Sequence, residues 1–284
     1  MNIADNGMIV NMQISQWSGH KLDKAMSQKV TDEAQADSDA ARVNKHLVPK
    51  ESLKDIVKAA GALRTHFYDR TLPWGDNGDR LLPRLAYMEF MQEHGRLNQE
   101  FDNAVVDFLD NKYLTARDRA AFRMGEMFRA EDYPEANSLR HRFAVILDVH
   151  GVPTGNDFRV AMNADDVSII RQQIEEKNQE RVTAALRDVW DRLASTLGHF
   201  ASKMSEDSIF RDSTVSNLED LVEMLPALNV TGDPGLEQIR RDIKDTLIGY
   251  GPKDLRKDAA VRQIAAKESQ RIIDQMSGFM AAFQ

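Results

Sequence analysis

Cationic and aromatic side chains are interleaved in two short segments of this 284-residue chain, a combination that suits single-stranded nucleic acid. An aromatic ring can stack on an unpaired base, while lysine and arginine contact the phosphates. The first segment begins at Trp17, and the second runs from Arg64 through Arg84. We take nine residues as candidates for nucleic-acid binding: Trp17, Lys21, Lys24, Lys45, Arg64, Tyr68, Arg70, Trp74 and Arg80.

Both segments also have a structural interpretation. Trp17 can complete the core at the end of a strand. Asp69, Asp76 and Asp79 can neutralise the neighbouring arginines, which would make the second segment a salt-linked loop. The final helix carries six basic and three acidic residues between Lys253 and Arg271, which suits phosphate contact, subunit association or simply a solvated face.

Composition limits the function classes. The net charge of −8 means that nucleic acid would have to bind a local basic patch rather than the protein as a whole. The absence of cysteine excludes disulfides, thiolate nucleophiles and cysteine-ligated metal sites. Phosphate-binding loops, dinucleotide fingerprints and zinc-protease motifs are also missing, and the seven histidines are scattered. We therefore expect no enzyme, cofactor or metal, although a catalytic site assembled from distant residues stays open as an alternative.

Hydropathy predicts a soluble protein. No stretch approaches the roughly 18–20 apolar residues that a membrane span needs, and the first ten residues lack the layout of a signal peptide. We expect the protein to be cytoplasmic.

Apolar periodicity predicts a predominantly helical α+β fold with a small antiparallel sheet, and not an OB-fold. Residues 10–14 alternate like a strand, whereas residues 143–149 and 158–162 form a predicted mid-chain hairpin. Since a hairpin alone is marginal in water, we expect the N-terminal strand to be its third member. Helices are predicted over residues 53–67, 82–109, 115–128, 165–206, 213–225, 236–248 and 255–276.

The helix over residues 165–206 is the longest. Its apolar residues are spaced alternately four and three apart, which is typical of a packed helix seam: Leu186, Trp190, Leu193, Leu197, Phe200 and Met204. A straight helix of this length exceeds the width of a compact domain, so we expect it to bend or to pack against another subunit. We divide the chain into a main domain over 1–206 and a C-terminal helical region over 207–284.

Several short segments of the sequence resemble a family of podovirus proteins. They are Gly7–Asn11 through Trp17, Lys21–Lys24, Thr71–Trp74, Gly78–Pro83, Pro153–Thr154, Asp157–Val160 and Leu225–Pro234. The chain is similar over most of its length to the single-stranded-DNA-binding RNA polymerase cofactors of podoviruses (Drc-like proteins).

This resemblance implies a helix-rich fold that binds single-stranded DNA. It also implies a homo-oligomer, a dimer or tetramer, that assists a phage RNA polymerase in middle-gene transcription within the cytoplasm of the infected bacterial host. The family supplies no binding residues here, so the nine candidates depend on charge and aromatic character. The alternative is an oligomeric structural or assembly protein that does not bind nucleic acid.

Overall fold

The computed structural model describes residues 3–155, 163–205 and 211–280, and it confirms a predominantly helical α+β fold with a small antiparallel sheet. The chain separates into two compact units, each assembled from distant parts of the sequence. Unit 1 comprises residues 1–11, 68–90 and 148–284, whereas unit 2 comprises residues 12–67 and 91–147. Residue 206, where the sequence was divided, is not a boundary between these units.

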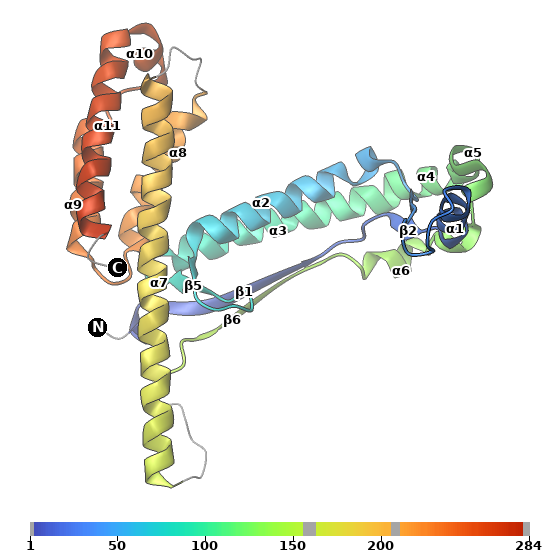
Figure 1. The fold of residues 1–284 in the computed structure, drawn as a ribbon, viewed down its shortest axis with the longest axis horizontal. Coiled ribbons are helices and arrows are strands. Elements are labelled where there is room, and N and C mark those ends of the chain that lie inside the picture. Colours follow the sequence, from blue (N-terminus) through green and yellow to red (C-terminus); the bar gives the residue numbers. More distant parts are fainter. Residues whose placement is uncertain (1–2, 156–162, 206–210, 281–284) are drawn as a thin grey trace. The chain divides into compact units, whose positions relative to one another are not determined.

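Unit 1 is built around helix α7 (Ala164–Ser205), which runs beside α8 (Ser213–Leu228) and α11 (Ala259–Met280) (Figure 1). Helices α9 (Pro234–Thr246) and α10 (Pro252–Lys257) complete the group. All six seam residues of α7 are buried in the core of this unit, as their spacing predicts. The partner that covers the seam is therefore found within the same chain.

Phe279, in the last turn of α11, also packs within unit 1. The Phe279 ring is stacked on Trp190 with 5.8 Å between the ring centres. Pro226, which we expected to end α8, lies inside the helix, which continues to Leu228. The next helix, α9, begins where Asp233 accepts a hydrogen bond from the backbone N–H of Leu236 at 2.8 Å, which satisfies one of the donors that a helix start leaves unpaired.

The main sheet has the strand order β4-β5-β1-β6, formed by Leu72–Pro73, Arg80–Pro83, Gly7–Ser15 and Ala144–Gly151. Strand β1 pairs antiparallel with β5, placing Gly7 opposite Pro83. The predicted pairing of the N-terminal strand with the first mid-chain strand is confirmed by the β1–β6 neighbours. The second predicted strand of that hairpin, residues 158–162, lies outside the described residues.

The β4–β5 hairpin corrects the sequence prediction, because Leu72–Pro73 and Arg80–Pro83 are strands and the helix predicted over residues 82–109 begins later. Its turn contains Gly78 at φ +83°, a left-handed conformation that glycine adopts without strain. Pro83 is extended and cannot donate to a helix, so α3 (Tyr87–Asp107) begins only after it.

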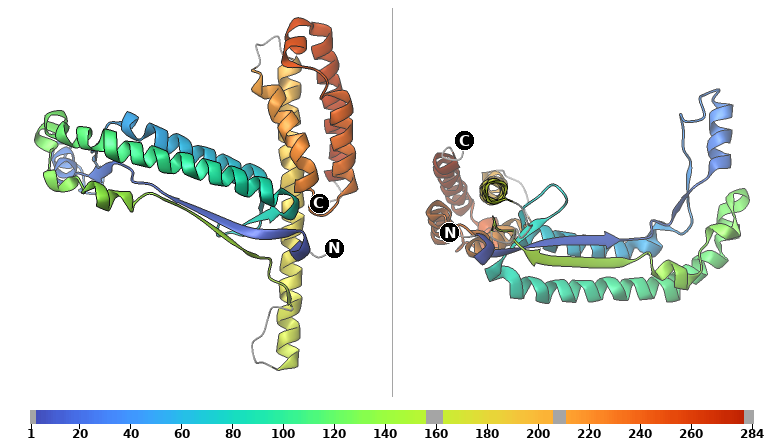
Figure 2. Two further views of the ribbon diagram at one scale, coloured as in Figure 1. Left: turned by 180° about the vertical axis from the view of Figure 1, so that it is seen from behind. Right: turned by 90° about the horizontal axis from the view of Figure 1, so that it is seen from below.

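Unit 2 contains α2 (Lys54–Arg70) up to Phe67 and α3 from Met91, which run side by side in the two views of Figures 1 and 2. Their apolar faces belong to one core. A π-helical turn (Phe108–Tyr113) extends α3 toward α4 (Leu114–Asp118), α5 (Ala120–Met124) and α6 (Ala136–Arg140). A second sheet pairs β2 (His20–Leu22) with β3 (Asn44–His46), and α1 (Lys24–Glu33) lies between them in the chain.

Candidate nucleic-acid interface

Trp17 is part of the core of unit 2. Its side chain is only 7% exposed, and its ring packs perpendicular to Tyr113 at 5.7 Å and against Phe108 at 6.1 Å. No face of the indole is open to a base in this conformation. The structural interpretation of Trp17 therefore describes the protein better than the stacking interpretation does.

Lys45 is likewise a structural residue. It is 6% exposed, and its ammonium lies 2.6 Å from Asp132 and 3.4 Å from Asp23. Burial alone would lower the pKa of Lys45, but these hydrogen bonds and ion pairs raise it, so the side chain stays charged. Lys21 contacts the same Asp132 at 2.5 Å, although half of its own side chain is exposed. Lys45 is thus corrected from a phosphate contact to part of a buried charge cluster.

Lys24 and Arg64 are exposed on α1 and α2. The other four candidates, Tyr68, Arg70, Trp74 and Arg80, belong to unit 1. The nine predicted residues are therefore divided between two compact units rather than gathered in one.

Three of the unit 1 candidates interact with neighbouring groups. The guanidinium of Arg80 lies 4.9 Å from the centre of the exposed Tyr68 ring and donates hydrogen bonds to Thr71. Burial and the nearby charge of Arg192 lower the pKa of Arg80. Arg70 pairs with Glu89 at 2.7 Å. These arginines are consistent with the salt-linked loop that the sequence left open.

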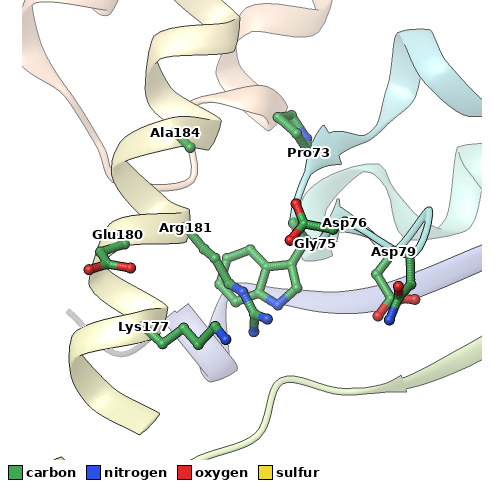
Figure 3. A pocket seen from close by; sticks show the side chains of 10 residues that line it. Pro73, Gly75, Asp76, Asp79, Lys177, Glu180, Arg181 and Ala184 are labelled. Carbon is green, nitrogen blue, oxygen red and sulfur yellow. The ribbon is translucent and has the colours of Figure 1, made fainter. Parts of the chain in front are cut away.

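Trp74 lines a cavity of about 480 Å³ between the β4–β5 turn and α7 (Figure 3). The indole is 3% exposed, with the guanidinium of Arg181 over its ring at 5.7 Å. Lys177 and Arg181 extend from α7 toward the turn that carries Asp76 and Asp79 (Figure 3).

This cavity has a mixed charge. Two cations face three carboxylates, those of Asp76, Asp79 and Glu180. Asp79 is held in place because the Asn11 amide donates to it at 3.0 Å. An anionic strand would meet more negative than positive groups here. The Trp74 cavity is therefore a poor phosphate site, although the sequence singled out this tryptophan.

A better candidate lies in unit 2, at Phe122 on α5. The Phe122 ring is 98% exposed, and Arg119 and Arg123, on either side of it in the sequence, are exposed as well. A cavity of about 770 Å³ adjoins the three side chains. We call this group of residues the Phe122 surface; its cavity is also lined by Pro49, Ser52, Asn111, Lys112, Thr115, Ala116 and Asp118.

The elements beneath the Phe122 surface are well anchored. Phe108, Leu109 and Tyr113 bury the π-helical turn in the core, and the Tyr113 hydroxyl donates to the Pro134 carbonyl at 2.6 Å. Arg123 donates a hydrogen bond to the His46 carbonyl, which joins α5 to the β2–β3 sheet. The ring of Phe122 therefore projects from a fixed base.

Two histidines lie beside this surface. The rings of His20 and His46 lie 4.1 Å apart across the β2–β3 pair. Partial burial and the charges of His20, Lys50 and Arg123 hold the pKa of His46 below its ordinary value. Desolvation is the largest cause of this lowered pKa, and the three nearby charges add to it.

A local excess of basic residues in the sequence indicates the Phe122 surface, although Phe122 is not among the nine candidates. Residues 112–129 hold five basic side chains and two acidic ones, around the exposed phenylalanine. Two of the five are ion-paired, Lys112 with Asp55 and Asp107, and Arg117 with Glu135. The final helix has the same excess of three and also contains ion pairs. There Arg256 pairs with Asp212, and Arg271 pairs with Glu268 at 2.8 Å.

Charge is also distributed unequally between the units. Unit 2 contains 17 of the 37 Lys and Arg residues and 17 of the 45 Asp and Glu residues, so it is formally neutral. Unit 1 contains the remaining 20 basic and 28 acidic residues, so it carries the whole net charge of −8. The basic-aromatic surface is thus on the unit that repels a polyanion less.

Comparison with family models, with curated proteins and with solved structures finds no match for this chain. Within the described ranges, no three His, Asp or Glu side chains are grouped so that they could hold a metal ion. Among the helices of those same ranges, none is both long and apolar enough to cross a membrane.

Proposed function

We propose that this protein binds single-stranded DNA through the Phe122 surface and that it acts as a binding protein rather than an enzyme. The observation that carries the proposal is the almost complete exposure of the Phe122 ring between two exposed arginines. The ring also lines a cavity with Pro49 and Ala116, so it belongs to a larger, partly apolar surface rather than being an isolated apolar side chain.

The side chains of the Phe122 surface suit single-stranded DNA better than duplex DNA. A base can stack on the phenyl ring only when its own face is free, and each such contact contributes about 1–3 kcal/mol. Arg119 and Arg123 can donate paired hydrogen bonds to phosphates on either side of that base. The adjoining cavity, with Pro49 and Ala116 in its wall, offers apolar space for a neighbouring base.

The finer proposal concerns the biological partner. The resemblance described above suggests that the protein is a cofactor of a phage RNA polymerase in the cytoplasm of an infected bacterium, acting in middle-gene transcription as a homo-oligomer. This part depends on the resemblance alone, whereas DNA binding has independent support from the Phe122 surface.

The test is a fluorescence anisotropy titration of labelled oligothymidylate with the full chain. Phe122→Ser combined with Arg119→Gln should weaken binding roughly tenfold or more, because one stacking contact and one phosphate contact are lost. The matched control, Tyr68→Ser with Arg84→Gln, removes one exposed ring and one exposed guanidinium from unit 1 and should leave the affinity unchanged.

The same titration with an unlabelled duplex competitor measures the preference for single strands. Equal affinity of the Phe122 variant and the wild type would contradict the proposed site. No binding of oligothymidylate by the wild type would contradict the function and would favour the structural or assembly alternative.

A further inference from the structure

Unit 1 carries an acidic, partly apolar cleft that the proposed function does not use. It has a volume of about 220 Å³, and it lies between the start of α3 and the last turns of α8. We call it the Leu85 cleft, and its lining includes Leu85, Ala86 and Glu89 from one side and Asp220, Glu223 and Met224 from the other.

Two large apolar side chains are exposed at this cleft or next to it in the sequence. Leu85 is 71% exposed, and Met88, one helical turn further along, is 76% exposed. Within unit 1 these are the highest values among the described large apolar residues. Neighbouring exposed apolar groups with a polar rim are typical of a protein interaction site.

The rim of the cleft is negatively charged. Asp220 and Glu223 are both exposed and are one turn apart on α8, and neither forms an ion pair with another described residue. The one cation in the lining, Arg70, is already paired with Glu89 at 2.7 Å. A partner that fits this cleft therefore presents an apolar group flanked by cations.

The Phe122 surface has that chemistry. Its ring is the most exposed apolar side chain among the described residues, and Arg119 and Arg123 lie one turn apart beside it. We propose that the Phe122 ring of one copy of the protein inserts into the Leu85 cleft of a second copy. Arg119 and Arg123 then face Asp220 and Glu223, so the apolar contact is surrounded by opposite charges.

Two consequences follow from this arrangement. The contact joins different surfaces of the two copies, so a pair keeps one free cleft on one copy and one free Phe122 surface on the other, and association continues beyond a dimer unless a ring closes. Because DNA is proposed to bind the same Phe122 surface, single-stranded DNA and a second copy compete for it, and a homo-oligomer that acts on DNA has to be held by a different contact. This second consequence rests on the proposed function, whereas the association itself does not.

Sedimentation velocity of the full chain over a range of concentrations tests the association. The wild type should shift to larger species as concentration rises. Phe122→Ser, and separately Asp220→Lys with Glu223→Lys, should raise the concentration needed for association roughly tenfold or more, as expected when a central contact is lost. Glu175→Lys with Glu176→Lys changes the net charge equally on exposed α7 residues and should associate like the wild type.

A mixture of the two disrupted variants provides the sharper result. The Phe122→Ser protein keeps its cleft, and the Asp220→Lys, Glu223→Lys protein keeps its ring, so together they should form one-to-one dimers and nothing larger. A mixture that stays monomeric, a wild type that is monomeric throughout, or cleft variants that associate normally would each overturn the proposal.

Oligothymidylate separates this proposal from the proposed function. DNA should dissociate the wild-type assemblies, and the cleft variant should bind DNA at least as tightly as its charge-matched control. If the wild type associates but does not bind DNA, the proposed function fails while the copy-to-copy contact stands. If DNA binds but the cleft variants associate like the wild type, the contact fails and the DNA site stands.

Discussion

The two units use similar residues in different ways. In unit 1 the rings and cations contact one another, as Tyr68 does with Arg80 and as Trp74 does with Arg181 of α7, and the unit is strongly acidic. In unit 2 the ring of Phe122 extends into solvent from a neutral unit. The comparison shows that a cation next to an aromatic residue in the sequence does not define a binding surface, because the two can satisfy each other.

The strongest test of this contrast in unit 1 is Trp74→Ala. Because the indole is buried, its loss should lower the free energy of unfolding by about 3–5 kcal/mol, as measured by urea denaturation. The affinity of the folded fraction for oligothymidylate should not change. A tenfold loss of affinity with normal stability would instead return Trp74 to the role of a stacking platform.

In unit 2, Lys45→Met should also act on stability. Among the described residues, removing the buried ammonium leaves Asp132 with Lys21 as its remaining ion-pair partner, which should cost about 3 kcal/mol. Urea denaturation measures the loss, and anisotropy on the remaining folded protein measures DNA affinity. If stability were normal and DNA affinity fell, Lys45 would be a phosphate contact after all.

Salt dependence gives a smaller effect that distinguishes the two units directly. Arg119→Gln should reduce the slope of log affinity against log salt by about 0.7, the value for one phosphate contact on a single strand. Arg84→Gln, an exposed arginine of unit 1, should leave the slope as it is. Equal slopes for both variants would mean that Arg119 does not contact phosphate.

The smallest expected effect is a pH dependence at His46. The folded protein holds the pKa of His46 below 6.5, so the unfolded chain binds this proton more readily and stability should fall as pH drops below about 6.5. A nearby phosphate favours the protonated ring, so DNA affinity should rise over the same window. His46→Gln should flatten both profiles, and profiles that match the wild type would show that His46 is not involved.

Much of the fold could be predicted because periodic patterns report burial directly. The seam from Leu186 to Met204 predicts the buried face of α7, and the alternation from Val10 predicts β1. The β4–β5 hairpin could not be predicted, because Leu82 and Leu85 fit a helical spacing as well as they fit a strand and the turn after it. Pro83 was the available signal for the later helix start.

The candidate site was harder to predict because exposure depends on tertiary packing. Trp17 and Phe122 are both aromatic residues near cations in the sequence, yet one packs on Tyr113 and the other is open to solvent. The local excess of basic residues over 112–129 was visible, but nothing in the spacing shows that Phe122 projects outward while Ala120, two residues earlier, is buried.

Photochemical crosslinking tests the central claim most directly. The complex of oligothymidylate with the full chain is irradiated, and peptide mass spectrometry then locates the crosslinks. The oligothymidylate should attach to Phe122 and its neighbours on α4 and α5. Dominant crosslinks at Trp74 or Tyr68, with none in residues 112–129, would contradict the account.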